Sequence, residues 1–164
     1  MIDPSQVKDR AEWLGDANYK FRRYLKSHAD GDELDRQFLE LHVRLFEGYD
    51  CSSCRNCCKE QHPILEDDEV APIAEYLQLT KEGFISTYLK ESQGEYEFLE
   101  TPCVFFKQGE PCLIEACMPR CCKNYPYTDK PERLSRMLGI IGSSYVCPVV
   151  FEILEQLKEQ YGFK

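Results

Sequence analysis

The spacing of the cysteines is the strongest chemical signal in this sequence, which contains ten of them among 164 residues. Four cysteines fall in the short run from Cys51 to Cys58, in the pattern C-x2-C-x2-C-C. Two-residue spacings let successive thiolates turn from one tight loop toward a single centre, as they do in zinc sites and in cubane iron-sulfur clusters. The run therefore predicts a cysteine-ligated metal site.

Six further cysteines follow this run. They are Cys103, Cys112, Cys117, Cys121, Cys122 and Cys147. In ferredoxins, cysteines at two-residue spacing and a remote cysteine followed by proline hold a [4Fe-4S] cluster. Cys51, Cys54 and Cys57 with Cys147-Pro148 reproduce that arrangement, although Pro148 also suits the first position of a helix. Four thiolates equally suit a tetrahedral zinc ion, so these residues leave a [4Fe-4S] cluster and zinc open.

The overall composition is that of a globular, acidic protein. Hydrophobic residues make up 43% of the chain, the formal net charge is -9 and the pI is near 4.9. A nucleic-acid-binding protein needs a basic face to meet phosphates, so this balance argues against DNA or RNA as a partner. The longest apolar stretch, residues 138–154, is interrupted by glycines, serines, a proline and a glutamate, and we therefore expect no membrane span.

The first residues of the sequence contain an acid and a proline, and they lack the basic stretch and apolar core of a secretion signal. We therefore expect a cytoplasmic protein. In that reducing compartment, cysteines serve as metal ligands or catalytic groups more often than as disulfides. Adjacent Cys57 and Cys58 also argue against a simple disulfide ladder, because the side chains of neighbouring residues diverge.

Hydrophobic periodicity predicts three helical regions. The first is an N-terminal helical hairpin over residues 1–48. The second is a pair of helices over residues 66–79 and 80–89, in which Pro72 favours a late start of the first helix. The third is a C-terminal helix over residues 148–162, with a proline at its first position and a glycine at its end.

Between these helices the pattern becomes irregular. Aromatic and branched residues flank the connection 107–111, which predicts a small antiparallel β-hairpin formed by residues 104–106 and 112–114. Residues 116–130 show no periodicity, and we expect a loop there. The predicted fold class is therefore mostly α with a small antiparallel β-hairpin, its helices and loops organised around a cysteine-ligated metal site.

The length of the chain suits one domain, because 164 residues can bury a sizeable hydrophobic core without help. We accordingly expect a single domain over residues 1–164. Within it, a cysteine cluster region over residues 49–150 follows the N-terminal hairpin and meets the C-terminal helix.

The run from Cys51 to Cys58 resembles the CxxCxxCC family, also called the YkgJ family, which is described as a zinc- or iron-chelating domain. A later segment of that family reads roughly Cys, a linker, and then Cys-x-Ile-Tyr-Glu-x-Arg-Pro-x-x-Cys-Arg-x-Phe/Tyr-Pro. In this sequence the stretch from Cys112 to Pro126 fits that frame without a gap. The cysteines that this resemblance implies as metal ligands are Cys51, Cys54, Cys57, Cys58, Cys103, Cys112, Cys122 and Cys147.

The sequence departs from the family pattern at several positions near these ligands. Arg55 stands where the family usually has glycine, so we expect the loop not to use a positive φ there. Met118 stands where the family has an arginine, and Arg120 is the candidate to replace that charge near the sulfur atoms. Cys117 and Cys121 are extra to the family pattern, and we expect them to be spare thiols.

These observations favour a metal-binding protein that holds an iron-sulfur cluster or zinc, with no reaction assigned. The alternative is an iron-sulfur enzyme or enzyme component that acts in redox chemistry or methyl transfer, because a similar domain occurs in flagellin lysine methylases. The sequence contains no phosphate loop, nucleophile elbow or separate methyl-donor domain, so we favour the binding module. His62 could add a nitrogen ligand, but a histidine in a loop is more often a surface residue.

Overall fold

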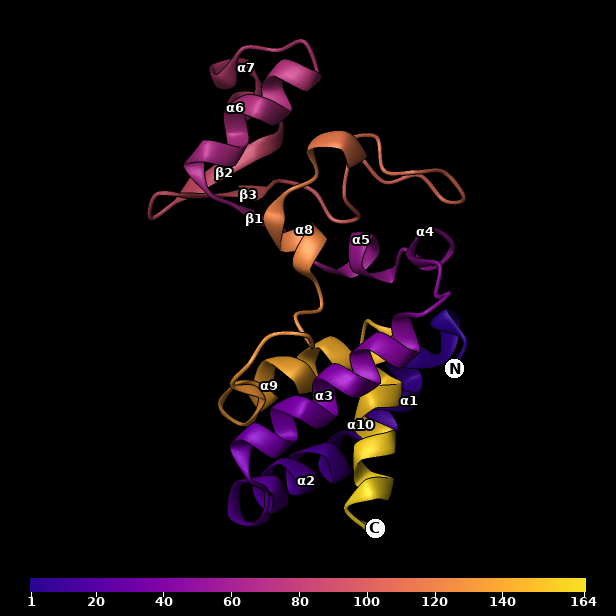
Figure 1. Ribbon diagram of the computed structural model, residues 1–164. Coiled ribbons are helices and arrows are strands. Elements are labelled where there is room, and N and C mark those ends of the chain that lie inside the picture. Colours follow the sequence, from indigo (N-terminus) through magenta and orange to yellow (C-terminus); the bar gives the residue numbers. More distant parts are fainter. The chain divides into compact units, whose positions relative to one another are not determined.

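The computed structural model describes residues 1–164 and divides them into two compact units (Figure 1). The helical unit comprises residues 1–49 and 126–164. The cysteine unit comprises residues 50–125, which contain every cysteine except Cys147. The structure is mostly helical with a small antiparallel sheet, as the sequence predicts. None of its helices combines the length and apolar character that a membrane span requires.

The helical unit is built from helices that come from both ends of the chain. They are the 3-10 helix η1 (Pro4–Gln6) and the α-helices α1 (Val7–Trp13), α2 (Gly15–His28), α3 (Gly31–Phe46), α9 (Arg133–Ser144) and α10 (Pro148–Gln160). Two aspartates cap these helices as N-cap chemistry requires. The carboxylate of Asp3 accepts a hydrogen bond from the Ser5 amide at 2.8 Å, and that of Asp30 accepts one from the Glu33 amide at 3.0 Å.

The core of the helical unit lies where α10 packs on α3 and α9, and where α9 also packs on α2 and α3. Each of these helices turns a buried apolar stripe inward, which is the arrangement that stabilises amphipathic helices in a globular protein. The buried residues are Phe21, Leu25, Leu34, Phe38, Leu41, Met137, Ile140, Ile141, Val149, Val150, Ile153, Leu154 and Leu157. This unit therefore has a substantial apolar core of its own.

Polar contacts hold the segment by which the chain re-enters the helical unit, residues 126–132. The hydroxyl of Thr128, which is buried, lies 2.8 Å from Nδ1 of His42. The carboxylate of Asp35 accepts hydrogen bonds from the amides of Glu132 and Arg133 at 2.7 and 2.8 Å. These bonds position the start of α9 against α3.

The cysteine unit consists of shorter elements. Its helices are α4 (Cys51–Cys54), α5 (Asn56–Glu60), α6 (Asp67–Tyr76), α7 (Lys81–Tyr88), the 3-10 helix η2 (Glu115–Cys117) and α8 (Arg120–Asn124). Its strands are β1 (Ile64–Leu65), β2 (Leu89–Ser92) and β3 (Glu95–Phe98). The sheet has the order β1-β3-β2 with both pairs antiparallel, and Leu89 pairs with Phe98 while Leu65 pairs with Tyr96.

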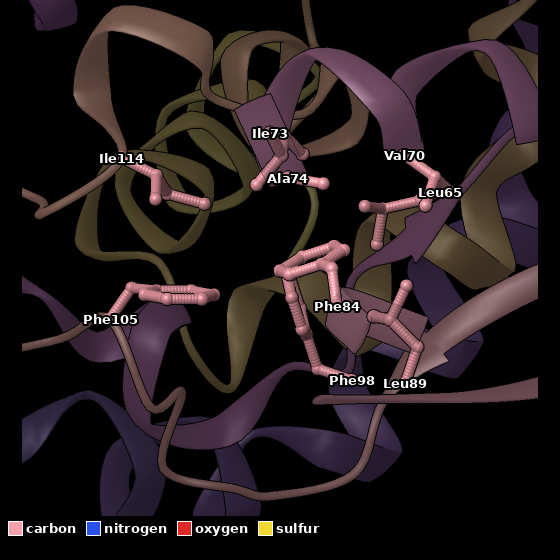
Figure 2. Packing of buried hydrophobic residues seen from close by; sticks show 9 residues of the cluster. All are labelled: Leu65, Val70, Ile73, Ala74, Phe84, Leu89, Phe98, Phe105 and Ile114. Atoms are coloured by element: carbon pink, nitrogen blue, oxygen red, sulfur yellow. The ribbon is translucent and has the colours of Figure 1, made fainter. Parts of the chain in front are cut away.

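The core of the cysteine unit is a cluster of nine buried residues (Figure 2). They are Leu65, Val70, Ile73, Ala74, Phe84, Leu89, Phe98, Phe105 and Ile114. The ring of Phe105 lies 5.5 Å from that of Phe98 and 6.4 Å from that of Phe84, measured between centroids. Cys103, Cys112 and Cys117 pack against this cluster, so the apolar core directly supports the segment that carries them.

The structure contains an antiparallel hairpin, as predicted, but at another place in the sequence. The structure pairs β2 with β3 through a two-residue turn at Gln93 and Gly94, whose φ values are 56° and 85°. Two positive φ values match the right-handed twist of the flanking strands, which is why such turns connect hairpins. Residues 104–106 and 112–114 form no strands, although the amide of Leu113 donates a hydrogen bond to the Phe105 carbonyl at 3.2 Å.

Three helical elements in the second half of the chain were also missed. The predicted loop over residues 116–130 contains part of η2 and all of α8, and α9 follows it with Gly139 and Gly142 inside the helix. Burial of the apolar face of α9 overrides the low helix propensity of glycine. Helix α6 does not start late, because it begins at Asp67 and runs through Pro72. A capping box between Glu66 and Glu69 supports this early start.

Candidate metal centre

The run of four cysteines is folded into two consecutive one-turn helices, α4 and α5. Asp50 begins this fold by accepting a hydrogen bond from the Ser52 amide at 2.8 Å, and its carbonyl accepts one from the Ser53 hydroxyl at 2.9 Å. Cys54 is buried, Cys57 and Cys58 are half-buried, and Cys51 is exposed. Short turns of this kind bring thiols at two-residue spacing toward one another.

Arg55 joins the two turns in the left-handed conformation, with φ 54° and ψ 16°. The expectation that arginine at this position precludes a positive φ is therefore wrong. The left-handed region costs a residue with a Cβ atom roughly 1–2 kcal/mol. The Arg55 side chain offsets this cost, because its Nε donates to the Ser52 carbonyl and its Nη2 donates to the Glu110 carbonyl, both at 3.1 Å.

The segment from Cys103 to Cys112 is tied to the first run by backbone contacts. The amide of Cys103 donates a hydrogen bond to the Cys58 carbonyl at 2.8 Å. The carbonyl of Cys103 in turn accepts from Phe106 at 2.9 Å, and that of Cys112 accepts from Glu115 at 3.0 Å. Together with the packing of Phe105 in the core, these bonds place the second group of cysteines beside the first.

Helix α8 carries the adjacent pair Cys121 and Cys122, whose sulfur atoms lie 4.0 Å apart. Arg120 precedes this pair and is fixed to the start of α6. Its Nη1 and Nη2 donate to the two carboxylate oxygens of Asp68 at 3.1 and 2.7 Å, and Nη2 also donates to Glu66 at 3.0 Å. Arg120 thus binds carboxylates, and it does not take the predicted place of an arginine near the sulfur atoms.

The electrostatic surroundings differ from one thiol to the next. The pKa of Cys58 is lowered to about 6, first because Cys57 hydrogen-bonds to it and then because the positive charge of Arg55 lies nearby. Burial raises the pKa of Cys51, Cys103 and Cys112. The lowered pKa favours the thiolate form of Cys58 near neutral pH, which is the form that binds a metal.

The contact within the Cys121 and Cys122 pair pushes the two pKa values apart. The hydrogen bond between the two thiols lowers the pKa of Cys121, while the same contact, reinforced by burial, raises the pKa of Cys122. The charges of Cys103 and Cys57 also raise the pKa of Cys122. Cys122 is thereby in electrostatic contact with both other cysteine groups of the unit.

The structure thus gathers seven of the eight cysteines that the sequence predicts as ligands in one unit. They are Cys51, Cys54, Cys57, Cys58, Cys103, Cys112 and Cys122. The two spare thiols of the prediction, Cys117 and Cys121, lie in the same unit. Cys147 lies in the helical unit, where it is buried, precedes the first residue of α10 and donates its amide to the Ser143 carbonyl at 2.8 Å.

All ten cysteines are free thiols, and no group of three or more His, Cys, Asp or Glu side chains is close enough together to hold a metal ion. The spacing of the side chains therefore does not by itself define a site. The chemistry of the donors does fit zinc or iron, because thiolates are the preferred ligands of both zinc and iron-sulfur clusters. His62 is half-exposed and its Nδ1 faces the carboxylate of Glu97 at 3.4 Å, as expected for a surface residue.

One feature of the site has a signal in the sequence. The acidic stretch Glu66 to Glu69 and the basic Arg120 have opposite charges, which makes them natural partners. By contrast, nothing in the sequence indicates that Arg55 reaches the carbonyl of Glu110. That contact depends on the positive φ at Arg55, which the identity of the residue argues against.

Comparison with known proteins agrees with this description. The chain matches the model of the CxxCxxCC family, described as "Putative zinc- or iron-chelating domain", over residues 50–141. The match covers the whole cysteine unit and continues into α9, but it ends before Cys147. No curated protein and no solved structure matches the chain. Since the match spans more than half of the chain and contains the complete C-x2-C-x2-C-C run, the chain belongs to the CxxCxxCC family.

Proposed function

We propose that this protein is a metal-binding module that holds an iron-sulfur cluster or zinc through cysteine thiolates. The proposed ligands are Cys51, Cys54, Cys57, Cys58, Cys103, Cys112, Cys122 and Cys147. The observation that carries the proposal is the gathering of the first seven in one unit by hydrogen bonds and a shared apolar core. The family description as a zinc- or iron-chelating domain gives independent support.

The residues of the site have distinct tasks in this proposal. The thiols must lose their protons on binding, and the lowered pKa of Cys58 favours this loss at that residue. Phe105 and Ile114 exclude water from one side of the segment that carries Cys103 and Cys112. When bound, a zinc ion would supply structural stabilisation, and a [4Fe-4S] cluster would supply one-electron redox chemistry.

Anaerobic purification followed by metal analysis and an absorption spectrum tests the proposal directly. Iron and inorganic sulfide with a broad visible absorption band indicate a cluster, whereas a colourless protein that contains zinc indicates a zinc site. A protein that retains neither metal, and that cannot be loaded with either under anaerobic conditions, would contradict the proposed function.

The contribution of Cys147 needs a separate variant, because this residue lies in the other unit. We propose a [4Fe-4S] cluster held by Cys51, Cys54, Cys57 and Cys147 as the specific form of the iron site. On that assignment Cys147→Ser lowers the iron content as much as Cys54→Ser does. If Cys147→Ser retains the full iron content while Cys54→Ser loses it, the fourth ligand comes from within the cysteine unit.

A further inference from the structure

Arg55 is an unusual residue to find at the centre of a cysteine site. The residue is only 8% exposed, and its backbone has the left-handed conformation that favours glycine. A buried guanidinium in a strained backbone is retained only when the surrounding contacts compensate for both. The surroundings of Arg55 therefore indicate what its side chain does.

The hydrogen bonds of Arg55 connect two segments that are far apart in sequence. Its Nε bonds to the Ser52 carbonyl within the first cysteine run, and its Nη2 bonds to the Glu110 carbonyl in the loop that leads to Cys112. A second contact between these segments, donated by the side-chain Nε2 of Gln108 to the Ser53 carbonyl, is longer at 3.4 Å. Arg55 thus supplies the shorter of these side-chain links.

Arg55 also stands between Cys54 and Cys57, in the run whose thiols would become thiolates. Its positive charge favours the thiolate form of Cys51, Cys58 and Cys112 by acting to lower the pKa of each. Four thiolates around a zinc ion carry a net charge of about -2, and withdrawing such a charge from water costs free energy. A fixed cation at this position neutralises part of that charge.

We propose that Arg55 is a positioning residue that holds the loop at 107–112 against the cysteine run and provides the positive charge for the metal-loaded thiolates. The second part of this inference rests on the proposed function, whereas the first part concerns the metal-free protein as well. Both parts act through the same side chain. Two substitutions separate them, because Arg55→Gly removes the hydrogen bonds and the charge, whereas Arg55→Lys keeps the charge.

Arg55→Gly tests the proposal, because the backbone and the side chain predict opposite effects on the stability of the segment. Glycine relieves the left-handed backbone, so a residue that served the backbone alone would gain from the change. Loss of the guanidinium instead removes the link to Glu110 and the charge beside Cys58. The matched control is Gln93→Gly, because Gln93 also has a positive φ, of 56°, in the hairpin turn of the same unit, and its side chain is exposed.

The first measurement is amide hydrogen exchange in the metal-free protein. We expect Arg55→Gly to accelerate exchange at Cys103, Phe106 and Leu113, whose amides are hydrogen-bonded in the second cysteine segment. Gln93→Gly should leave these amides unchanged. Wild-type exchange at these amides in Arg55→Gly would overturn the positioning role, whether or not the protein binds metal.

The second measurement is the zinc affinity, determined by competition with a chromophoric chelator. We expect Arg55→Gly to bind zinc at least about tenfold more weakly than the wild type, and Arg55→Lys to recover a clear part of that loss because it keeps the charge. Gln93→Gly should bind as the wild type does. Equal affinities of Arg55→Gly and the wild type would overturn the charge role, and so would equal affinities of Arg55→Gly and Arg55→Lys.

A wild-type protein that binds neither zinc nor iron would instead overturn the proposed function, and the exchange result would still decide the positioning role.

Discussion

The two units of this molecule reach order by different means. The helical unit has four helices of twelve or more residues, each with a buried apolar stripe. The cysteine unit contains no helix longer than the ten residues of α6, and four of its helical elements have five residues or fewer. Helices of one turn are not stable alone, so tertiary contacts must hold them. The helical unit therefore depends on its core, whereas the cysteine unit combines a core of nine residues with many short helices, and the proposed binding of a metal by its thiols would add to its stability.

Removal of the metal is expected to produce the largest difference between the units. The binding free energy of a structural zinc site, about 10–16 kcal/mol, becomes folding free energy when the site exists only in the folded state. We therefore expect chelation to lower the melting temperature of the cysteine unit strongly and to leave most of the helical circular dichroism signal of the helical unit intact. An unchanged melting curve for the fully metal-free protein would mean that the nine-residue core of the cysteine unit is sufficient by itself.

Truncation of one phenylalanine in each core should sharpen the same comparison. Phe84 and Phe38 are fully buried in the cysteine unit and the helical unit respectively, and removing either ring should cost about 3–5 kcal/mol. We expect Phe84→Ala to unfold the cysteine unit in the metal-free protein and to be partly rescued by metal. Phe38→Ala should not be rescued. Denaturant titrations with and without metal measure both effects, and equal rescue of the two variants would show that the units are not energetically distinct.

The N-caps offer a smaller and more local comparison. The carboxylate of Asp30 caps α3 in the helical unit, and the hydroxyl of Thr80 caps α7 by accepting from the Gly83 amide at 3.0 Å. Replacing either residue by alanine should cost about 1 kcal/mol. Hydrogen exchange should locate the loss in α3 for Asp30→Ala and in α7 for Thr80→Ala. A loss that spreads over both units in either variant would contradict their separation.

The smallest effect is expected for the two cysteines that are extra to the family pattern. The double variant Cys117→Ser and Cys121→Ser should keep the wild-type ratio of metal to protein, because neither residue belongs to the proposed ligand set. The corresponding change at Cys54 and Cys57 is the matched control and should abolish binding. A double variant that arrives with half the metal would assign Cys121 to the site, in agreement with its contact of 4.0 Å to the Cys122 sulfur.

The sequence predicted the helical unit well where the signals were local. The start of the last helix at Pro148 and its end near Gly162 both follow from single residues with strong positional preferences. Helix α9 was missed because its two glycines argue against a helix locally, and only burial of Met137, Ile140 and Ile141 compensates.

The cysteine unit was harder to predict because its contacts are not local. The spacing of the cysteines correctly indicated the CxxCxxCC family, but it could not indicate which backbone segments would pair. The hairpin was assigned to the branched residues around the glycine at 109, whereas the chain turns at Gln93 and Gly94. The contact of Arg55 with Glu110 joins residues that are 55 positions apart, and no periodicity encodes such a pair.

The order of the two units along the chain has a consequence for synthesis. The helical unit takes α1, α2 and α3 from before the cysteine unit, and α9 and α10 from after it. A ribosome therefore completes residues 50–125 while the first three helices still lack the apolar faces of α9 and α10. Since domains fold as units during synthesis, the cysteine unit is the first that can fold completely, and the early helices must wait with Phe21, Phe38 and their neighbours uncovered. If the cysteine unit folds together with its metal, the supply of metal to the nascent chain would determine how soon a folded unit forms between α3 and α9 along the chain.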